Sequence, residues 1–248
     1  MSKTLAIIFN YNAKKMTDDL YESLLPASTE EYDLYILDNG TEKPEEVSAN
    51  TSVRLEKNVY FGGAVNASFS IFLHNRDKYD SLMILNNDIF VGENFIKVMR
   101  QRLFERDFKL ISPAVLQPEA QQTCWKHLRN WGAKETREVR WVDYYCPFFH
   151  GDLVEHIGKF SDILQIGWGL DLYTGHLCDQ KGWKAGVVDS STVIHFGAQT
   201  YKDNKAQIPF SEYGRRAEIG MYQFFQSEGL MKELEDLRQY GLNYTYEG

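Results

Sequence analysis

The chain has 248 residues, of which 43% are hydrophobic and 25% are charged, and its formal net charge is −8. This length is sufficient for one large α/β domain. The charge argues against a broad nucleic-acid surface, because such surfaces are built from clustered lysine and arginine. No apolar run approaches the roughly 20 residues of a membrane span, and the first run, residues 5–9, is too short for the core of a secretory signal. We expect a soluble cytoplasmic protein, with peripheral attachment at the inner membrane face as the alternative.

The chain contains three cysteines: Cys124, Cys146 and Cys178. Their number is odd, and no two of them have the spacing of a CxxC motif. The pattern predicts neither a disulfide framework nor a zinc site, and it is consistent with a reducing compartment.

Short apolar runs alternate with amphipathic stretches through the first half of the chain. The runs that predict strands are residues 5–9, 32–37, 53–55 and 82–85. The stretches between and after them, which are typical of helices, are residues 16–25, 63–74 and 95–104. This alternation predicts an α/β fold with a mostly parallel, Rossmann-like central sheet flanked by helices.

The second half of the chain is less regular. Residues 113–149 are rich in aromatic side chains, and a helical stretch after Asp171 ends near Gly182. A strand is expected over residues 185–196, followed by a polar loop over 198–207 and two C-terminal helices within 211–238. We expect one domain with a nucleotide-binding half at 1–112, an acceptor and metal half at 113–210, and C-terminal helices at 211–248.

Polar residues follow each predicted strand of the first half. They are Asn10 to Asn12, Asp38 to Gly40, Asn58 with residues 61–63, and Asn86 to Asp88. Ligands of open α/β sheets bind beyond the carboxyl ends of the strands, so these residues predict a binding site at one edge of the sheet.

Two carboxylates in these polar segments have ligand-binding and structural interpretations. Asp38 could accept hydrogen bonds from a nucleotide base or ribose, or it could form an Asx turn with Asn39 and Gly40. Asp88 could hold a divalent cation against phosphate oxygens, or it could form a turn or cap a helix that begins near Glu93.

A later segment offers a candidate base and a second metal ligand. Gly167 and Gly169 permit a tight turn that presents Trp168 to a sugar ring, and Asp171 behind them could act as a general base or cap a helix. His195, at the end of a predicted strand, could bind a metal through its neutral imidazole, although a lone histidine is more often structural.

Five segments occur in an order that is similar to the family 2-like glycosyltransferases of the GT-A fold, which include bacterial rhamnosyl- and galactosyltransferases. They are LYILDNGT at 34–41, NVYFGGAVN at 58–66, MILNND at 83–88, WGLD at 168–171 and VIH at 193–195. The resemblance covers roughly residues 4–225. It implies transfer of a sugar from a nucleotide diphosphate donor to an acceptor hydroxyl, with inversion at the anomeric carbon.

The resemblance also implies a role for individual residues. The expected donor-binding residues are Asn10, Asp38, Asn39, Asn58, Gly62, Gly63, Asn66, Asn87, Arg215 and Arg216. Asp171 is the expected catalytic base, and Asp88 and His195 are the expected ligands of Mn²⁺ or Mg²⁺. The expected acceptor-binding residues are Trp168, Gly169 and Tyr145.

The sequence departs from the family pattern at two places. Asn86 stands at the first position of the family's Asp-x-Asp motif, which removes one negative charge from the expected metal site. The acidic pair of the family is reduced to Leu170-Asp171, so that Asp171 is expected to act without a neighbouring carboxylate. The loop at 198–207 is expected to close over the donor.

Two other classes of function compete with transfer. A nucleotidyltransferase would need an early glycine-rich and basic phosphate loop, for which residues 9–15 are a poor match. A catalytically inactive nucleotide- or sugar-binding module would keep the fold without turnover. The expected acceptor is a glycan or surface polysaccharide. A hydroxylated DNA base stays open, although the acidic net charge disfavours nucleic acid.

Overall fold

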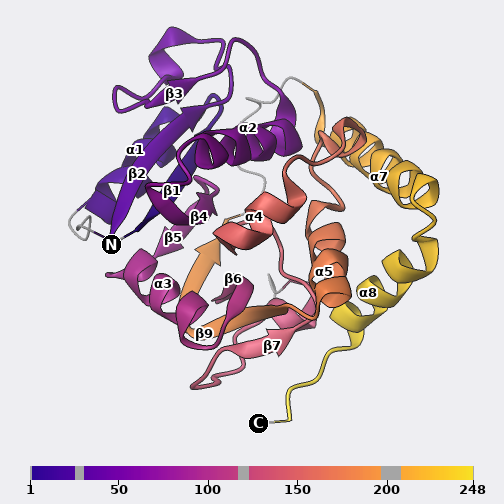
Figure 1. Ribbon diagram of the computed structural model, residues 1–248. Coiled ribbons are helices and arrows are strands. Elements are labelled where there is room, and N and C mark those ends of the chain that lie inside the picture. The colour runs from indigo at the N-terminus through magenta and orange to yellow at the C-terminus, as the bar shows by residue number, and fades with distance from the viewer. Residues whose placement is uncertain (1, 26–30, 117–122, 197–207, 248) are drawn as a thin grey trace.

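The computed structural model describes residues 2–25, 31–116, 123–196 and 208–247, and within them nine strands form one sheet flanked by helices (Figure 1). The strand order is β3-β2-β1-β4-β8-β6-β9-β5, and β7 pairs with β9 outside this path. The predicted α/β class with helices around a central sheet is confirmed. Strands from both halves of the chain belong to this one sheet.

The first half forms the parallel part of the sheet. Its strands are β1 (Lys3–Asn10), β2 (Tyr32–Asp38), β3 (Val53–Arg54) and β4 (Tyr79–Leu85). β1 pairs in parallel with β2 and β4, and β2 pairs in parallel with β3. Leu5 to Ile8 and Leu82 to Leu85 are completely buried. Such strands read as continuous apolar runs because helices cover both faces of a parallel sheet.

Antiparallel strands that the sequence pattern did not reveal complete the sheet. β8 (Phe148–His150) lies between β4 and β6 (Phe108–Val115) and is antiparallel to both. β5 (Ile89–Val91) and β7 (Arg137–Val139) are each antiparallel to β9 (Lys184–His195), which is parallel to β6. Three-residue strands are too short to show a period of two, and tertiary pairing decides them.

The helices of the first half are α1 (Lys14–Leu24), α2 (Tyr60–His74) and α3 (Phe95–Glu105), as predicted within a few residues. Asp88 does not cap α3, since β5 intervenes and Asn94 is the N-cap residue. The helix-cap interpretation of Asp88 is therefore wrong.

The later helices are α4 (Gly151–Ile157), α5 (Leu170–Lys181), α7 (Phe210–Ser227) and α8 (Met231–Asn243). Short 3₁₀ turns occur as η2 (Pro44–Glu46), η4 (Lys126–Leu128) and η5 (Asp162–Leu164). α8 packs against α5, α7 and η4, and Figure 1 shows α7 and α8 beside α5. Through its contact with η4, α8 packs on the irregular segment at residues 113–149.

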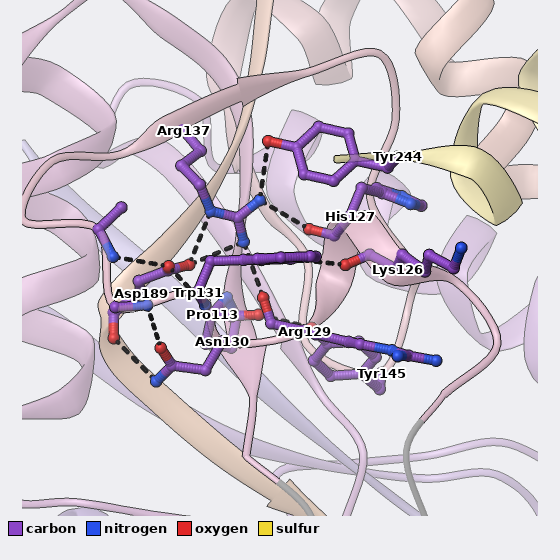
Figure 2. Close-up of polar contacts among 12 residues, drawn as sticks. Pro113, Lys126, His127, Arg129, Asn130, Trp131, Arg137, Tyr145, Asp189 and Tyr244 are labelled. Atoms are coloured by element: carbon purple, nitrogen blue, oxygen red, sulfur yellow. Dashed lines mark hydrogen bonds and ion pairs between the residues drawn. The ribbon is translucent and has the colours of Figure 1, made fainter. Parts of the chain in front are cut away.

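A buried ion pair fixes this irregular segment to the sheet (Figure 2). Arg137 donates from Nε and Nη2 to Asp189 Oδ1 of β9, at 3.0 and 2.7 Å, and the two side chains are 2% and 0% exposed. Asp189 Oδ2 accepts the backbone N–H groups of Trp131 and Ala133 at 2.8 and 2.9 Å. Both carboxylate oxygens are thus hydrogen-bonded, as a buried charge requires.

The remaining donors of Arg137 bind three further groups. Nη1 donates to the His127 carbonyl at 3.0 Å and to the Tyr244 hydroxyl at 3.1 Å, and Nη2 donates to the Arg129 carbonyl at 2.9 Å (Figure 2). One guanidinium therefore joins η4, the end of α8 and β9. We expect the position of Trp125, immediately before η4, to depend on this ion pair.

Candidate active site

A cavity of about 690 Å³ opens where β1, β2 and β4 end. Asn10 ends β1, Asn39 follows β2, and Asn87 lies just beyond β4. Predicted site residues in its lining are Asn10, Asn39, Asn58, Asn87, Asp88, Tyr145, Trp168, Gly169, Asp171 and His195. The structure thus brings the expected base, metal ligands and several donor-side residues to one cavity at the carboxyl edge of the sheet.

Asp88 and His195 lie together because β5 pairs with the end of β9. Ile89 is the register partner of His195, and the Phe196 N–H donates to the Asp88 carbonyl at 2.9 Å. This pairing places Asp88 Oδ1 3.2 Å from His195 Nε2. The ring of Tyr145 lies 5.5 Å from the His195 ring, centroid to centroid.

The Asp88–His195 pair fits a divalent cation. A carboxylate oxygen and an imidazole nitrogen both bind Mn²⁺, and two ligands about 2.1 Å from one cation, at right angles, lie about 3.0 Å apart. Within the described residues, no third aspartate, glutamate, histidine or cysteine joins them as a possible ligand. The other ligands of a cation here would be oxygens of a bound molecule or water.

Asp171 lies in the first turn of α5, and its Oδ1 accepts the Leu172 N–H at 2.9 Å. Burial and, as the second cause, the negative charge of Asp143 raise the pKa of Asp171 from 3.8 to about 7. Asp143 lines the same cavity, and burial raises its own pKa while His195 opposes that shift. A carboxyl group with a pKa near neutrality is suited to proton transfer.

The expectation that Asp171 acts without a neighbouring carboxylate is therefore wrong. Asp143 supplies the second carboxylate from the segment between β7 and β8, far from Asp171 in the sequence. No motif surrounds Asp143, and only the insertion of β8 into the sheet carries this segment to the cavity.

The predicted glycine turn around Trp168 is present. Gly167 and Gly169 have φ values of 119° and 91°, which side chains rarely adopt, and a Cβ on them would lie 2.8 Å from Phe61 Cδ1 and 2.9 Å from Met221 Cγ. The turn leaves Trp168 42% exposed at the cavity. Its contact with a sugar stays a prediction.

Asp38 is turned away from the cavity. Its carboxylate is completely buried, accepting Asn10 Nδ2 at 2.8 Å and the Thr41 N–H at 3.0 Å, with Arg54 Nε at 3.4 Å. The hydrogen bond to Thr41 lies one residue beyond that of an Asx turn with Asn39 and Gly40, so Asp38 has a structural role without that turn. The residue holds the loop after β2 and does not line the cavity.

Five other expected donor residues are also absent from the cavity lining, and three of them have polar side chains. Asn66 exchanges two hydrogen bonds with the Phe160 backbone, at 3.1 and 2.8 Å. Arg215 and Arg216 are exposed and both pair with Glu212, at 2.9 and 2.6 Å. Each of these side chains has a structural partner in place of a cavity contact.

Gly62 and Gly63 act through packing. A Cβ on Gly62 would lie 2.4 Å from the Leu164 carbonyl oxygen, and the Gly62 N–H donates to the Gln165 carbonyl at 2.8 Å. A Cβ on Gly63 would lie 2.7 Å from the Val59 side chain. Neither glycine lines the cavity, but Gly62 lets α2 approach the segment that leads to Trp168. The loop at 198–207 lies outside the described residues.

Neither a family model nor a curated protein sequence matches the chain, but several solved structures share its architecture. GalNAc-T7 with UDP, GalNAc and Mn²⁺ aligns with a TM-score of 0.62 and 15% identity over 96% of this chain and 55% of that one. The TarS 1–349 fragment of S. aureus with UDP-GlcNAc gives 0.56 and 12%, over 96% and 81%. PcManGT, a mannosyltransferase from Pyrobaculum calidifontis with GDP-Man and Mn²⁺, gives 0.55 and 9%, over 98% and 76%.

The chain has the GT-A fold. At these identities the alignments establish the fold, and they confirm the resemblance drawn from the five sequence segments at that level. Within the described ranges, this GT-A chain has no helix that is both long enough and apolar enough to cross a bilayer.

The GT-A cavity also contains residues to which the sequence analysis assigned no individual role. Tyr11 lines it beside Asn39 and Asn58, and its hydroxyl is buried close to the Asn58 side chain. Trp125 and Arg238 line it from η4 and α8. The position of Tyr11 directly after β1 was the one available signal, since ligands bind beyond strand ends.

Proposed function

We propose that this protein is a glycosyltransferase that moves a sugar from a nucleotide diphosphate donor to an acceptor hydroxyl. One observation carries the proposal: a single cavity holds the Asp88–His195 pair and, in Asp171, a carboxyl group whose pKa is about 7. The solved structures with the same fold include complexes with UDP-GlcNAc and GDP-Man, which supports a nucleotide-sugar donor.

The donor lies across the carboxyl edge of the sheet in this proposal. Its nucleoside contacts Tyr11, Asn39 and Asn58, whose hydroxyl and amide groups can hydrogen-bond a base or a ribose. Its diphosphate lies toward Asp88 and His195, which would hold Mn²⁺ or Mg²⁺. When bound, such a cation neutralises negative charge on the departing diphosphate.

Asp171 acts as the base. The acceptor oxygen forms a bond to the anomeric carbon while the bond from that carbon to the diphosphate oxygen breaks, and the diphosphate leaves with the electron pair. The proton of the acceptor hydroxyl passes to the Asp171 carboxylate, and the anomeric configuration inverts. Trp168 and the turn at Gly169 orient the acceptor. We propose that the acceptor is a glycan or surface polysaccharide.

Tyr145 supports the site indirectly. Its hydroxyl donates to the Pro113 carbonyl at 2.5 Å, and its buried ring lies against His195. These contacts favour a role in orienting the imidazole over the acceptor contact expected from the resemblance.

The experiment that tests the function is a donor screen. UDP-, dTDP-, GDP- and CMP-sugars are titrated into the protein with Mn²⁺, Mg²⁺ or EDTA, and binding and slow donor hydrolysis are measured. We expect one donor to bind and hydrolyse in a metal-dependent way. Asp88→Asn should weaken the metal dependence, whereas Asp162→Asn, at an exposed residue that pairs with Lys159, should not. Failure of every nucleotide to bind would refute the proposal.

The rate should depend on pH through Asp171. A base must be deprotonated, so kcat/KM should rise about tenfold per pH unit below the pKa and level off above about 7. Asp143→Asn removes a negative charge that raises the pKa of Asp171. This variant should therefore shift the acidic limb of the profile to lower pH. An unchanged or higher midpoint would contradict the coupling of the two carboxylates.

A further inference from the structure

Arg238 is a cavity residue that the proposed chemistry does not use. It lies on α8 and lines the cavity with Trp125 and with Glu218 of α7. Its Nη1 donates to the Tyr222 hydroxyl at 2.8 Å, and its guanidinium lies 6.0 Å from the Tyr222 ring centroid. Within the described residues no carboxylate lies within ion-pair distance of Arg238.

Within the described residues, only Arg238 and Arg129 among the arginines have no carboxylate partner, and of these two only Arg238 lines the cavity. Arg129 donates twice to the Thr123 carbonyl, and every other arginine of the chain pairs with a carboxylate. Arg140, which contacts α8 through Glu233, also pairs with Asp179. Because the protein carries a net charge of −8, acidic partners are abundant. A guanidinium has five N–H donors, and Tyr222 accepts from one of its nitrogens, so donors remain for a ligand.

Arg238 lies on the wall of the cavity formed by η4, α7 and α8. The Leu237 carbonyl accepts the Trp141 indole N–H at 3.0 Å, and the Trp141 ring lies 5.1 Å from the Trp125 ring, centroid to centroid. α8 packs on η4, α5 and α7, whereas the proposed nucleoside contacts follow β1 and β2. Arg238 thereby lies with Trp125 on a part of the cavity wall that is built from other elements than the proposed nucleoside contacts, and we assign this part to the acceptor.

We propose that Arg238 recognises an anionic group on the acceptor, a phosphate or a carboxylate carried by a saccharide. This inference rests on the proposed function. Indole rings provide apolar faces for a sugar, and an arginine fork binds carboxylate and phosphate through two parallel hydrogen bonds. Trp125 and Trp168 supply the rings, and Arg238 supplies the charge. Glu218 is exposed at the same cavity and, within the described residues, forms no ion pair with Arg238.

The test compares matched acceptor analogues. Methyl glucoside, methyl glucuronide and methyl glucoside 6-phosphate are titrated into the wild-type protein in the presence of the nucleotide that binds most tightly, and Kd is measured. We expect an anionic analogue to bind at least about tenfold more tightly than the neutral one. The anionic analogue that binds more tightly than methyl glucoside identifies the recognised group as a carboxylate or a phosphate.

Three variants test whether Arg238 causes the preference for anionic analogues. Arg238→Gln should reduce the anionic preference to about onefold, Arg238→Lys should keep part of it, and Arg102→Gln, at a residue on α3 paired with Glu105, should keep all of it. Unfolding midpoints verify that each variant is folded. A neutral analogue that binds as well as the anionic ones, or an anionic preference that survives Arg238→Gln, overturns the inference.

Two results separate this inference from the proposed function. Loss of nucleotide affinity in Arg238→Gln, with the glycoside preference intact, would place Arg238 on the donor side and overturn the inference alone. A wild-type protein that binds no nucleotide sugar refutes the glycosyltransferase proposal, and the glycoside titrations, repeated without nucleotide, still report whether Arg238 selects anions.

Discussion

Asp171→Asn should lower kcat by about 10²- to 10⁴-fold, the usual contribution of a general base. Asparagine keeps the size of the side chain and an oxygen that can accept the Leu172 N–H, so the start of α5 should be preserved. Donor binding should change little because the proposed nucleoside contacts lie at the ends of β1 and β2. Single-turnover transfer and donor titrations, with the donor identified by the screen, measure the two effects separately.

The matched control is Asp179→Asn, at a partly exposed residue on the same helix that pairs with Arg140. This variant should turn over at nearly the wild-type rate. Near-normal turnover of Asp171→Asn would show that another group accepts the proton, whereas loss of donor binding together with kcat would indicate disruption of the cavity.

The stability of Asp171→Asn provides a second control. The pKa of Asp171 is raised from 3.8 to about 7 on folding, so the unfolded chain releases this proton first as the pH rises. The carboxyl group therefore lowers stability progressively between about pH 4 and pH 7. The Tm of Asp171→Asn should be no lower than that of wild type at pH 8, which excludes unfolding as the cause of lost activity.

Asp189→Ala should lower the free energy of unfolding by about 3–5 kcal/mol, because it leaves the buried Arg137 guanidinium without its counterion. The substitution also removes the acceptor of the Trp131 and Ala133 N–H groups. Denaturant unfolding followed by tryptophan fluorescence measures the loss. We expect the segment before η4 to become less ordered, so that Trp125 no longer holds a fixed position in the cavity lining.

Two comparisons locate this effect in the buried ion pair. Glu212→Gln breaks exposed ion pairs with Arg215 and Arg216 and should cost no more than about 1 kcal/mol. Combining Asp189→Leu with Arg137→Met removes both buried charges and should recover much of the stability lost in Asp189→Ala. A loss of less than about 1 kcal/mol in Asp189→Ala would show that water reaches Arg137.

The sequence predicted the parallel part of the fold because its signal is local. Leu5 to Ile8 and Leu82 to Leu85 are buried on both faces, so their apolar character is continuous and visible in one dimension. A residue that directly follows a strand in the sequence must lie at the carboxyl end of that strand, so the polar residues after these strands could be placed at that edge of the sheet without knowledge of the tertiary structure. Asn39, Asn58 and Asp88 were found in this way, and they line the cavity.

Tertiary structure decided which of the polar residues face the cavity and which new ones join them. Asp38 has the expected position after β2, but Asn10 and Thr41 bind its carboxylate inside the protein. Asp143 reaches the cavity with Asp171 only because a three-residue strand, β8, is inserted between β4 and β6. Short strands, buried carboxylates and the position of Arg238 at the cavity depend on partners distant in the chain, and for that reason no local pattern encodes them.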